Sequence, residues 1–285
     1  MHAQELALPA LDGFRLAATL HATGAPARGV VVVAGAAGVP RRYYAPFAAF
    51  LARSGLTTLS FDYRGVGGSR PARLRGFRAD LHEWGERDLG GAITWAGDRW
   101  PDLPLLMVTH SVGGQVLGLA PTLERVTAVL SVASQSGYWN LWSGARRWQM
   151  GAYFHLVIPL VARLAGYLPM RLVGGEDLPR DVALEWARWA RDPQYVLSHA
   201  RARGAAGYGR YDGPWRAYAF SDDPYAPARA VERLLGFYPR ARADLRLVTP
   251  AQAGRPVGHF DFFRPPFEAT LWAEARDWLL AQATG

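Results

Sequence analysis

The chain has 285 residues, of which half are hydrophobic, 20% are charged and 12% are aromatic, a balance that excludes an intrinsically disordered protein. It contains no cysteine and no lysine, which excludes disulfides, thiolate metal sites, cysteine nucleophiles, Schiff-base lysines and the lysine of Walker-type nucleotide-binding loops. The net charge is +8, but the arginines are scattered and often stand beside acids, as in Arg87-Asp88, so we expect no nucleic-acid partner.

The first 133 residues alternate between apolar runs and segments with helical spacing. A turn at Asp12-Gly13 separates the first two expected strands and favours a hairpin. Residues 29–34 (GVVVVA) are continuously apolar, which is typical of a strand buried on both faces of a parallel sheet. Strands are expected at 5–9, 14–21, 29–34, 56–61, 103–109 and 127–133, and helices at 45–53, 79–100 and 112–120.

Regular alternation stops over residues 134–213 and then resumes. The later strands are expected at 215–220 and 243–248, and the later helices at 227–235 and 267–282. Strand–helix alternation on both sides of an irregular segment indicates one α/β domain with a parallel sheet. We therefore assign residues 1–133 and 214–285 to the core and 134–213 to an inserted helical lid, because the segment is too long for a simple connection.

One stretch inside this insertion, residues 150–170, has the length of a membrane span. It carries His155, Pro159 and Arg163, and charge within a span is costly. We expect a buried or lid helix with no stable membrane insertion, and leave peripheral contact with a membrane surface open. The N-terminus shows no basic region followed by an apolar run, so a cytoplasmic location is expected.

The most informative motif is Thr109-His110-Ser111-Val112-Gly113-Gly114-Gln115, between an expected buried strand and an expected helix. A serine on a sharp strand-to-helix turn projects its hydroxyl above the sheet, and small neighbours let the strand and helix approach. Gly113 satisfies that need, whereas Thr109 stands where glycine is usual. The helix that follows also directs its N-terminal amides toward the serine.

These residues resemble the α/β-hydrolase superfamily, in the branch that contains serine aminopeptidases and monoglyceride-lipase-like esterases. The resemblance includes the strand and loop at 29–38, the run Phe61-Asp62-Tyr63-Arg64-Gly65-Val66-Gly67-Gly68-Ser69 and the serine motif. The insertion run Gly174-Gly175-Glu176-Asp177-Leu178-Pro179 is similar to a subfamily of predicted bacterial hydrolases. The implied architecture is an α/β-hydrolase fold, with a mostly parallel central sheet, helices on both faces and an inserted helical lid.

The resemblance also implies the catalytic residues. Ser111 is the expected nucleophile, and His259, in the loop after the last strand, is the expected base. The acid should follow strand 215–220, where the family's loop pattern favours Asp223; Asp222 remains the alternative, because spacing does not separate neighbouring carboxylates. His110 adjoins Ser111, but adjacent residues on a turn point apart, so it is not expected to be the base.

Two backbone amides are expected to form the oxyanion hole by similarity to the family. One is Val112, and the other lies in the loop after strand 29–34, where we assign Ala36. We interpret Asp62 and Arg64 as residues that hold the loop after strand 56–61 rather than as catalytic residues.

The insertion is rich in aromatic residues, and Trp139, Trp142 and Tyr153 are candidate substrate-binding residues that could form an apolar roof. The sequence therefore predicts a serine hydrolase that cleaves a carboxylic ester, thioester or amide of a hydrophobic small molecule, with no metal or organic cofactor. An acyltransferase that uses the same three residues, or a non-catalytic ligand-binding protein with this fold, are the alternatives.

Overall fold

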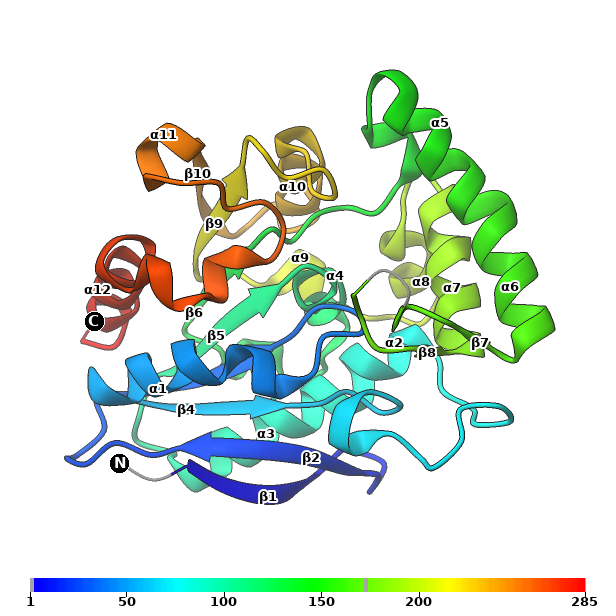
Figure 1. Cartoon of the computed structure of the whole chain (residues 1–285). Helices are drawn as coiled ribbons and strands as arrows, with labels where there is room; N and C mark the ends of the chain where they lie inside the picture. Colours follow the sequence, from blue (N-terminus) through cyan, green and yellow to red (C-terminus); the bar gives the residue numbers. More distant parts are fainter. Residues whose placement is uncertain (1–2, 172–173, 285) are drawn as a thin grey trace.

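The computed structural model describes residues 3–171 and 174–284, and a single eight-stranded sheet runs through the core (Figure 1). The strand order is β1-β2-β4-β3-β5-β6-β9-β10. The strands are β1 (Ala3–Pro9), β2 (Arg15–His21), β3 (Gly29–Ala34), β4 (Leu56–Phe61), β5 (Leu105–His110), β6 (Ala128–Val132), β9 (Pro214–Phe220) and β10 (Arg242–Val248).

The sheet is parallel except at its N-terminal edge. β1 pairs with β2, and β2 with β4, in antiparallel register, whereas all pairs from β4 to β10 are parallel. Every residue of β3, β4, β5 and β6 is buried, which confirms the burial predicted for residues 29–34 and for the strand before Ser111. The predicted fold class, a mostly parallel α/β sheet with helices on both faces, is confirmed.

The helices of the core cover both faces of the sheet (Figure 1). α1 packs with the C-terminal helix on one face, where Phe47 and Phe50 contact Trp272. The core helices are α1 (Ala45–Arg53), α2 (Leu81–Glu83), α3 (Gly90–Arg99), α4 (Val112–Val116), α10 (Ala228–Leu235), α11 (Pro250–Ala253) and α12 (Ala273–Gln282).

The expected helices at 79–100 and 267–282 are each interrupted by a π-helical turn. Residues Trp84–Leu89 form one such turn between α2 and α3, and Glu268–Trp272 form another before α12. The helix expected at 112–120 ends earlier, because α4 tightens into a 3-10 helix at Leu117–Leu119. Short 3-10 and π segments are common at helix ends and change the axial register without changing which elements pack.

Residues 134–213 form a helical group beside the sheet, with α5, α6 and α7 grouped on one side of the molecule (Figure 1). The elements are α5 (Gly144–Ala152), a π-helical turn (Tyr153–Val157), α6 (Ile158–Ala165), β7 (Tyr167–Leu168), β8 (Leu178–Pro179), α7 (Arg180–Arg191), α8 (Val196–Ala202) and α9 (Gly207–Arg210). None of the helices in the described part of the chain is long and apolar enough to cross a membrane. The stretch expected as a buried or lid helix is helical, but one of its faces is exposed rather than buried.

An ion pair joins this group to the core. His82, in α2, contacts Glu185, in α7, through its backbone N–H (2.8 Å) and its Nδ1 (2.9 Å) to the same carboxylate oxygen. His199 and Arg188 also face Glu185, and Glu86 and Asp80 face His82. Burial lowers the pKa of His82, but the hydrogen bond and charge of Glu185 outweigh it, so the pKa is raised above 6.5.

This pair makes stability depend on pH. Because the folded pKa of His82 lies above its unfolded value, protonated His82 stabilises the fold fully below about pH 6.5. The contribution is lost as pH rises through the folded pKa; the pKa of Glu185 is lowered, so its own contribution is lost only in acid. We expect His82→Gln to reduce the free energy of unfolding by about 1 kcal/mol at pH 5.5 and by clearly less at pH 9.

Urea denaturation of both proteins at the two pH values checks this expectation. His155→Gln is the matched control, because its imidazole is exposed and bonds only the Gly151 carbonyl of its own helix. An equal loss at both pH values in His82→Gln would contradict the assignment of a charged His82–Glu185 pair.

Candidate active site

Ser111 occupies a strained turn between β5 and α4. Its φ is +51° and its ψ is −114°, a conformation that non-glycine residues rarely adopt. Such a conformation costs on the order of 1–3 kcal/mol and persists only where packing on both sides enforces it. The turn places the serine at the carboxyl end of β5, directly before the first amide of α4.

Two glycines allow the strand and the helix to close around this turn. A Cβ atom on Gly113 would lie 2.3 Å from the Ala34 carbonyl oxygen, and one on Gly114 would lie 2.6 Å from the Ser134 side chain. Thr109, where glycine is usual, fits because Gly114 leaves space for it: the Thr109 hydroxyl lies 3.3 Å from that of Ser134. The second glycine therefore compensates for the missing first one.

Three side chains distant in sequence meet beside this turn. The Nε2 of His259 lies 3.0 Å from the Ser111 Oγ, and its Nδ1 lies 2.7 Å from an oxygen of Asp223. Ser111 follows β5, Asp223 follows β9 and His259 follows β10, so all three lie at the carboxyl edge of the sheet. All three residues are buried.

The contacts assign the protons in this group. A carboxylate is an acceptor, so the His259 Nδ1 carries a proton and donates a hydrogen bond to Asp223, and Nε2 is free to accept the Ser111 hydroxyl proton. The other Asp223 oxygen accepts the backbone N–H groups of Tyr225 (2.7 Å) and Ala226 (2.9 Å). The carboxylate is thus fixed in position by the turn that follows it.

Asp222 has a different partner. Its carboxylate accepts the N–H groups of Val257 (2.9 Å) and Gly258 (3.1 Å). It therefore fixes the backbone immediately before His259 instead of contacting the imidazole. Of the two neighbouring carboxylates that the sequence left open, the structure brings Asp223 to the histidine.

The two predicted oxyanion amides differ. Val112 provides the first N–H of α4, which has no acceptor within the helix and faces the serine turn. The N–H of Ala36 instead donates to the buried Tyr44 hydroxyl at 2.8 Å. The assignment of Ala36 is therefore corrected: its amide is occupied, and the next amide, that of Ala37, donates to no residue in the described part of the chain.

Tyr44 and His110 extend this contact into a buried chain of hydrogen bonds. The Tyr44 hydroxyl lies 2.8 Å from the His110 Nδ1, and the His110 Nε2 lies 2.8 Å from the backbone carbonyl of His259. A carbonyl only accepts, so Nε2 carries the proton and Nδ1 accepts the tyrosine O–H. Burial holds the pKa of His110 well below 6.5, which keeps the ring neutral and this tautomer fixed.

This chain joins the two loops that the site needs. It runs from the Ala36 amide through Tyr44 and His110 to the His259 carbonyl, so the oxyanion loop and the histidine loop share one set of contacts. Sequence reasoning excluded His110 as a base but did not find this role. Its position beside Ser111 was the available signal, whereas nothing in the sequence indicated Tyr44.

Glu176 contacts the oxyanion loop from the insertion. Its backbone N–H donates to the Gly38 carbonyl at 2.7 Å, and its carboxylate accepts the Gly67 N–H (2.8 Å) and pairs with Arg42 (3.0 Å). A Cβ atom on Gly38 would lie 2.6 Å from the Glu176 carbonyl oxygen, so only glycine permits this approach. The sequence motif around Glu176 therefore has a structural function that its resemblance alone did not specify.

Asp62 and Arg64 hold loops, as interpreted from the sequence. Asp62 accepts the backbone N–H groups of Arg41 (2.6 Å) and Gly68 (2.8 Å) and pairs with the Arg41 guanidinium. Arg64 is buried and pairs with Asp88 at 2.6 Å. Neither residue contacts Ser111 or His259.

Aromatic rings surround His259 on its exposed side. The rings of Tyr225 and Phe260 lie 5.5 Å and 4.9 Å from the imidazole, and both residues are exposed. The Arg146 guanidinium, from α5, lies 5.8 Å from the Tyr225 ring. Neither ring was predicted from the sequence, because both residues lie in loops beside the histidine and not in the aromatic-rich insertion.

The three predicted substrate-binding residues occupy different places. Trp142 is buried, and its indole donates to the Pro224 carbonyl at 3.0 Å, so it anchors the insertion to the Asp223 loop. Tyr153 is half-buried; burial, with a further contribution from Tyr225, raises its pKa to about 12. Trp139 is half-buried against Trp148 and His155.

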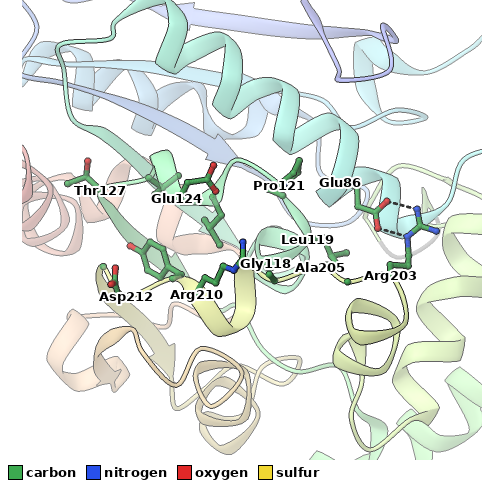
Figure 2. A pocket seen from close by; sticks show the side chains of 18 of the residues that line it. Glu86, Gly118, Leu119, Pro121, Glu124, Thr127, Arg203, Ala205, Arg210 and Asp212 are labelled. Atoms are coloured by element: carbon green, nitrogen blue, oxygen red, sulfur yellow. Dashed lines mark hydrogen bonds and ion pairs between the residues drawn. The ribbon is translucent and has the colours of Figure 1, made fainter.

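A cavity in the described part of the chain lies away from these residues. It encloses about 760 Å³ at the far end of α4 from Ser111 and is lined by residues that include Glu86, Gly118, Arg203 and Arg210 (Figure 2). Its lining contains none of Ser111, Asp223 and His259, and its Arg203 is paired with Glu86 at 2.7 Å (Figure 2).

His82, Glu185 and His199 have the composition of a metal site, with ligand atoms within 4.8 Å of one another. The Glu185 oxygens already accept from His82 and Arg188, so we attribute this cluster to the ion pairing between α2 and α7.

Comparison with known proteins agrees with the geometry. Residues 24–199, more than half of the chain, match the model of the family described as serine aminopeptidase, S33. The chain belongs to this family. It is an α/β hydrolase by fold.

The solved structures that resemble this α/β hydrolase include a soluble variant of monoglyceride lipase from Saccharomyces cerevisiae, at a TM-score of 0.70 and 15% identity, with 97% of this chain and 96% of that chain covered. A thermostable carboxyl esterase from Bacillus coagulans matches at a TM-score of 0.65 and 15% identity, with 99% of both chains covered. The α/β hydrolase GrgF from Penicillium sp. sh18 matches at a TM-score of 0.61 and 18% identity, with 100% of both chains covered. No curated protein sequence matches this chain.

The buried chain through Tyr44 gives a testable expectation. Tyr44→Phe removes the acceptor of the Ala36 N–H and the donor to the His110 Nδ1, so both loops lose a shared contact. We expect the reaction of Ser111 with a fluorophosphonate to slow by at least ten-fold and the protein to lose about 1–3 kcal/mol of unfolding free energy. Rates of covalent labelling and urea titrations measure the two effects.

Tyr211→Phe is the matched control for this variant. Tyr211 is also buried, and its hydroxyl donates to the Pro214 carbonyl at 3.1 Å, away from the site. It should cost stability and leave the labelling rate unchanged. Equal labelling rates in Tyr44→Phe and the wild type would refute the positioning role.

Proposed function

We propose that this protein is a serine hydrolase that cleaves a carboxylic ester of a hydrophobic small molecule through an acyl-enzyme. The observation that supports the proposal most is the position of the His259 imidazole, 3.0 Å from the Ser111 hydroxyl and 2.7 Å from Asp223. A serine hydroxyl is a weak nucleophile until a base accepts its proton, and this arrangement supplies the base and the group that orients it.

The mechanism follows from the proton positions. The Ser111 Oγ attacks the ester carbonyl while its proton passes to the His259 Nε2, and the amides of Val112 and Ala37 receive the negative oxygen. Asp223 stabilises the resulting imidazolium without taking its proton. His259 then donates this proton to the departing alcohol. A water molecule, deprotonated by the same nitrogen, attacks the acyl carbon, and His259 returns the proton to the Ser111 Oγ as the acid is released.

The surroundings favour a neutral, apolar substrate. The exposed rings of Tyr225 and Phe260 border His259. The insertion is the proposed lid of this site, with Trp139 and Tyr153 as its proposed substrate contacts. Trp142 serves this lid by anchoring it to the Asp223 loop. Arg146 lies beside Tyr225, and its charge opposes the ammonium group that an aminopeptidase substrate would bring. An ester therefore fits better than a peptide N-terminus.

Two other functions are compatible with the same fold. An acyltransferase would form the same acyl-enzyme and pass the acyl group to an alcohol, amine or thiol instead of water. A non-catalytic binding protein would need none of the contacts that join Ser111, His259 and Asp223. Product analysis with and without added acceptors separates the first alternative, and labelling of Ser111 separates the second.

The neighbouring carboxylates provide a sharp test of the proposed triad. Asp223→Asn should reduce kcat by on the order of 10⁴-fold, because an amide no longer fixes the correct histidine tautomer. Asp222→Asn keeps an oxygen that accepts the Val257 and Gly258 N–H groups, so most activity should remain. Hydrolysis of a nitrophenyl ester by the two variants gives the comparison.

Labelling with a fluorophosphonate identifies the nucleophile itself. The wild type should be labelled, whereas Ser111→Ala should not, and His259→Ala should react on the order of 10³-fold more slowly. Absence of label on the wild type would remove the enzyme hypothesis, and label that survives Ser111→Ala would move the nucleophile elsewhere.

Chain length tests the proposed apolar substrate. Each buried methylene contributes about 0.8 kcal/mol, so kcat/KM for nitrophenyl esters should rise by roughly three- to four-fold per methylene until the site is full. Acetate, butyrate, hexanoate and decanoate esters form the series. Equal values for acetate and decanoate would contradict an apolar acyl site.

A further inference from the structure

The exposed large hydrophobic residues of this protein are concentrated on one helical segment. Nine such residues are exposed in the described part of the chain, and five of them lie between positions 148 and 164. These five, which we call the apolar row, are Trp148 (68% exposed), Leu156 (67%), Val157 (44%), Leu160 (60%) and Leu164 (72%). Soluble proteins seldom leave so much contiguous apolar surface without a partner.

The π-helical turn at Tyr153–Val157 places these side chains on one face. In an uninterrupted α-helix, Trp148 and Leu164 would point about 160° apart, because each residue turns the chain by about 100°. A π-helical turn inserts about one extra residue and rotates the following turns back by roughly 100°. The row then occupies about a quarter of the helix circumference over roughly 24 Å of length.

The opposite face of the segment is already packed. Phe154, Ile158 and Ala162 are buried in the hydrophobic core that includes α7, and the Phe154 ring lies 5.4 Å from that of Trp186. A rotation of the helix that buried the apolar row would therefore expose these three apolar side chains. A partner for the row therefore has to come from outside the described residues.

The charge of the segment selects the partner. Residues Gly144–Ala165 contain Arg146, Arg147 and Arg163 and no Asp or Glu, and the whole chain carries a net charge of +8. The Arg147 guanidinium lies 5.3 Å from the Trp148 ring, so cationic and aromatic groups share the end of the row. Apolar side chains on one face, with a tryptophan and arginines along the border, are the pattern of a helix that lies in the interface of an anionic bilayer.

We propose that the apolar row docks this protein on an anionic membrane surface, with the α5–α6 axis parallel to the bilayer plane. A second copy of the chain fits less well, because it would bring the same arginines together without any carboxylate in the segment to pair with them. The docking surface is independent of the proposed hydrolase activity. It would also bring the bilayer beside Arg146, whose guanidinium lies over Tyr225 at the border of His259.

Co-sedimentation of the full chain with vesicles tests the proposal. Vesicles of phosphatidylglycerol and phosphatidylcholine in equal parts should bind the wild type, and the affinity should fall as NaCl rises from 50 to 500 mM. Vesicles of phosphatidylcholine alone should bind at least ten-fold more weakly. Leu160→Glu should reduce binding to the anionic vesicles by at least ten-fold, because it removes an inserted side chain and adds a repelled charge.

Leu247→Glu is the matched control. Leu247 is half exposed on the edge strand β10, so the variant makes the same change of side chain and charge away from the row. It should bind within about two-fold of the wild type. Circular dichroism and urea titration of both variants show that the fold is retained.

Three results would overturn the proposal. These are no binding of the wild type to anionic vesicles, equal binding by Leu160→Glu, or a dimer in solution that Leu160→Glu converts to a monomer, which would make a second copy the occupant. The Ser111→Ala protein should bind vesicles like the wild type. Vesicle binding and ester hydrolysis can therefore fail or succeed separately.

Discussion

The close approach of α4 to β3 is the constraint on which the site depends. Gly113 lies against the Ala34 carbonyl, and the space that a methyl group would need is absent. Because α4 is held this close to the sheet, Ser111, which connects it to β5, is forced to φ +51°. The cost of this conformation is small beside the burial of β3 and β5, whose residues are all buried. The position of the Ser111 hydroxyl is thus a consequence of how the core packs.

The second requirement is that the loops that follow different strands keep fixed positions relative to one another. Asp222 fixes the backbone before His259, Asp223 fixes its ring, and His110 holds its carbonyl. Two of these contacts involve His259 itself, at its ring and at its carbonyl, and the third holds the two residues before it. Rotation of the imidazole and displacement of its loop are therefore restricted independently. Through Tyr44, the contact at the carbonyl also reaches the oxyanion loop. The neutral His110 suits this role because a charged ring would place two donors where one acceptor is needed.

The sequence predicted the fold well where burial alone determines it. The strands at 29–34 and 56–61 and the helix at 45–53 have the predicted bounds. Residues 29–34 are continuously apolar, and Ser54-Gly55 directly after the helix marks its end. The π-helical turns were not predictable, because they depend on how the helices pack in the folded protein and not on local composition. At the site, spacing placed two aspartates near the histidine but could not separate them, because one residue of register decides which carboxylate faces the ring. The assignment of Ala36 failed for a different reason: the buried Tyr44 hydroxyl, eight residues further along the chain and outside the motifs considered, accepts the N–H of Ala36.

The insertion faces both the site and the solvent, and its two sides are chemically distinct. On the inner side, Glu176 contacts Gly38 and Gly67, so the backbone that follows Ala37 is held partly by the insertion. On the outer side, the apolar row has no partner within the described residues. Between them, the buried Phe154 and Ile158 join the outer helix to the rest of the insertion. Because the Glu176 amide and the Gly38 carbonyl are in direct contact, the geometry of the oxyanion loop cannot be independent of the position of the insertion.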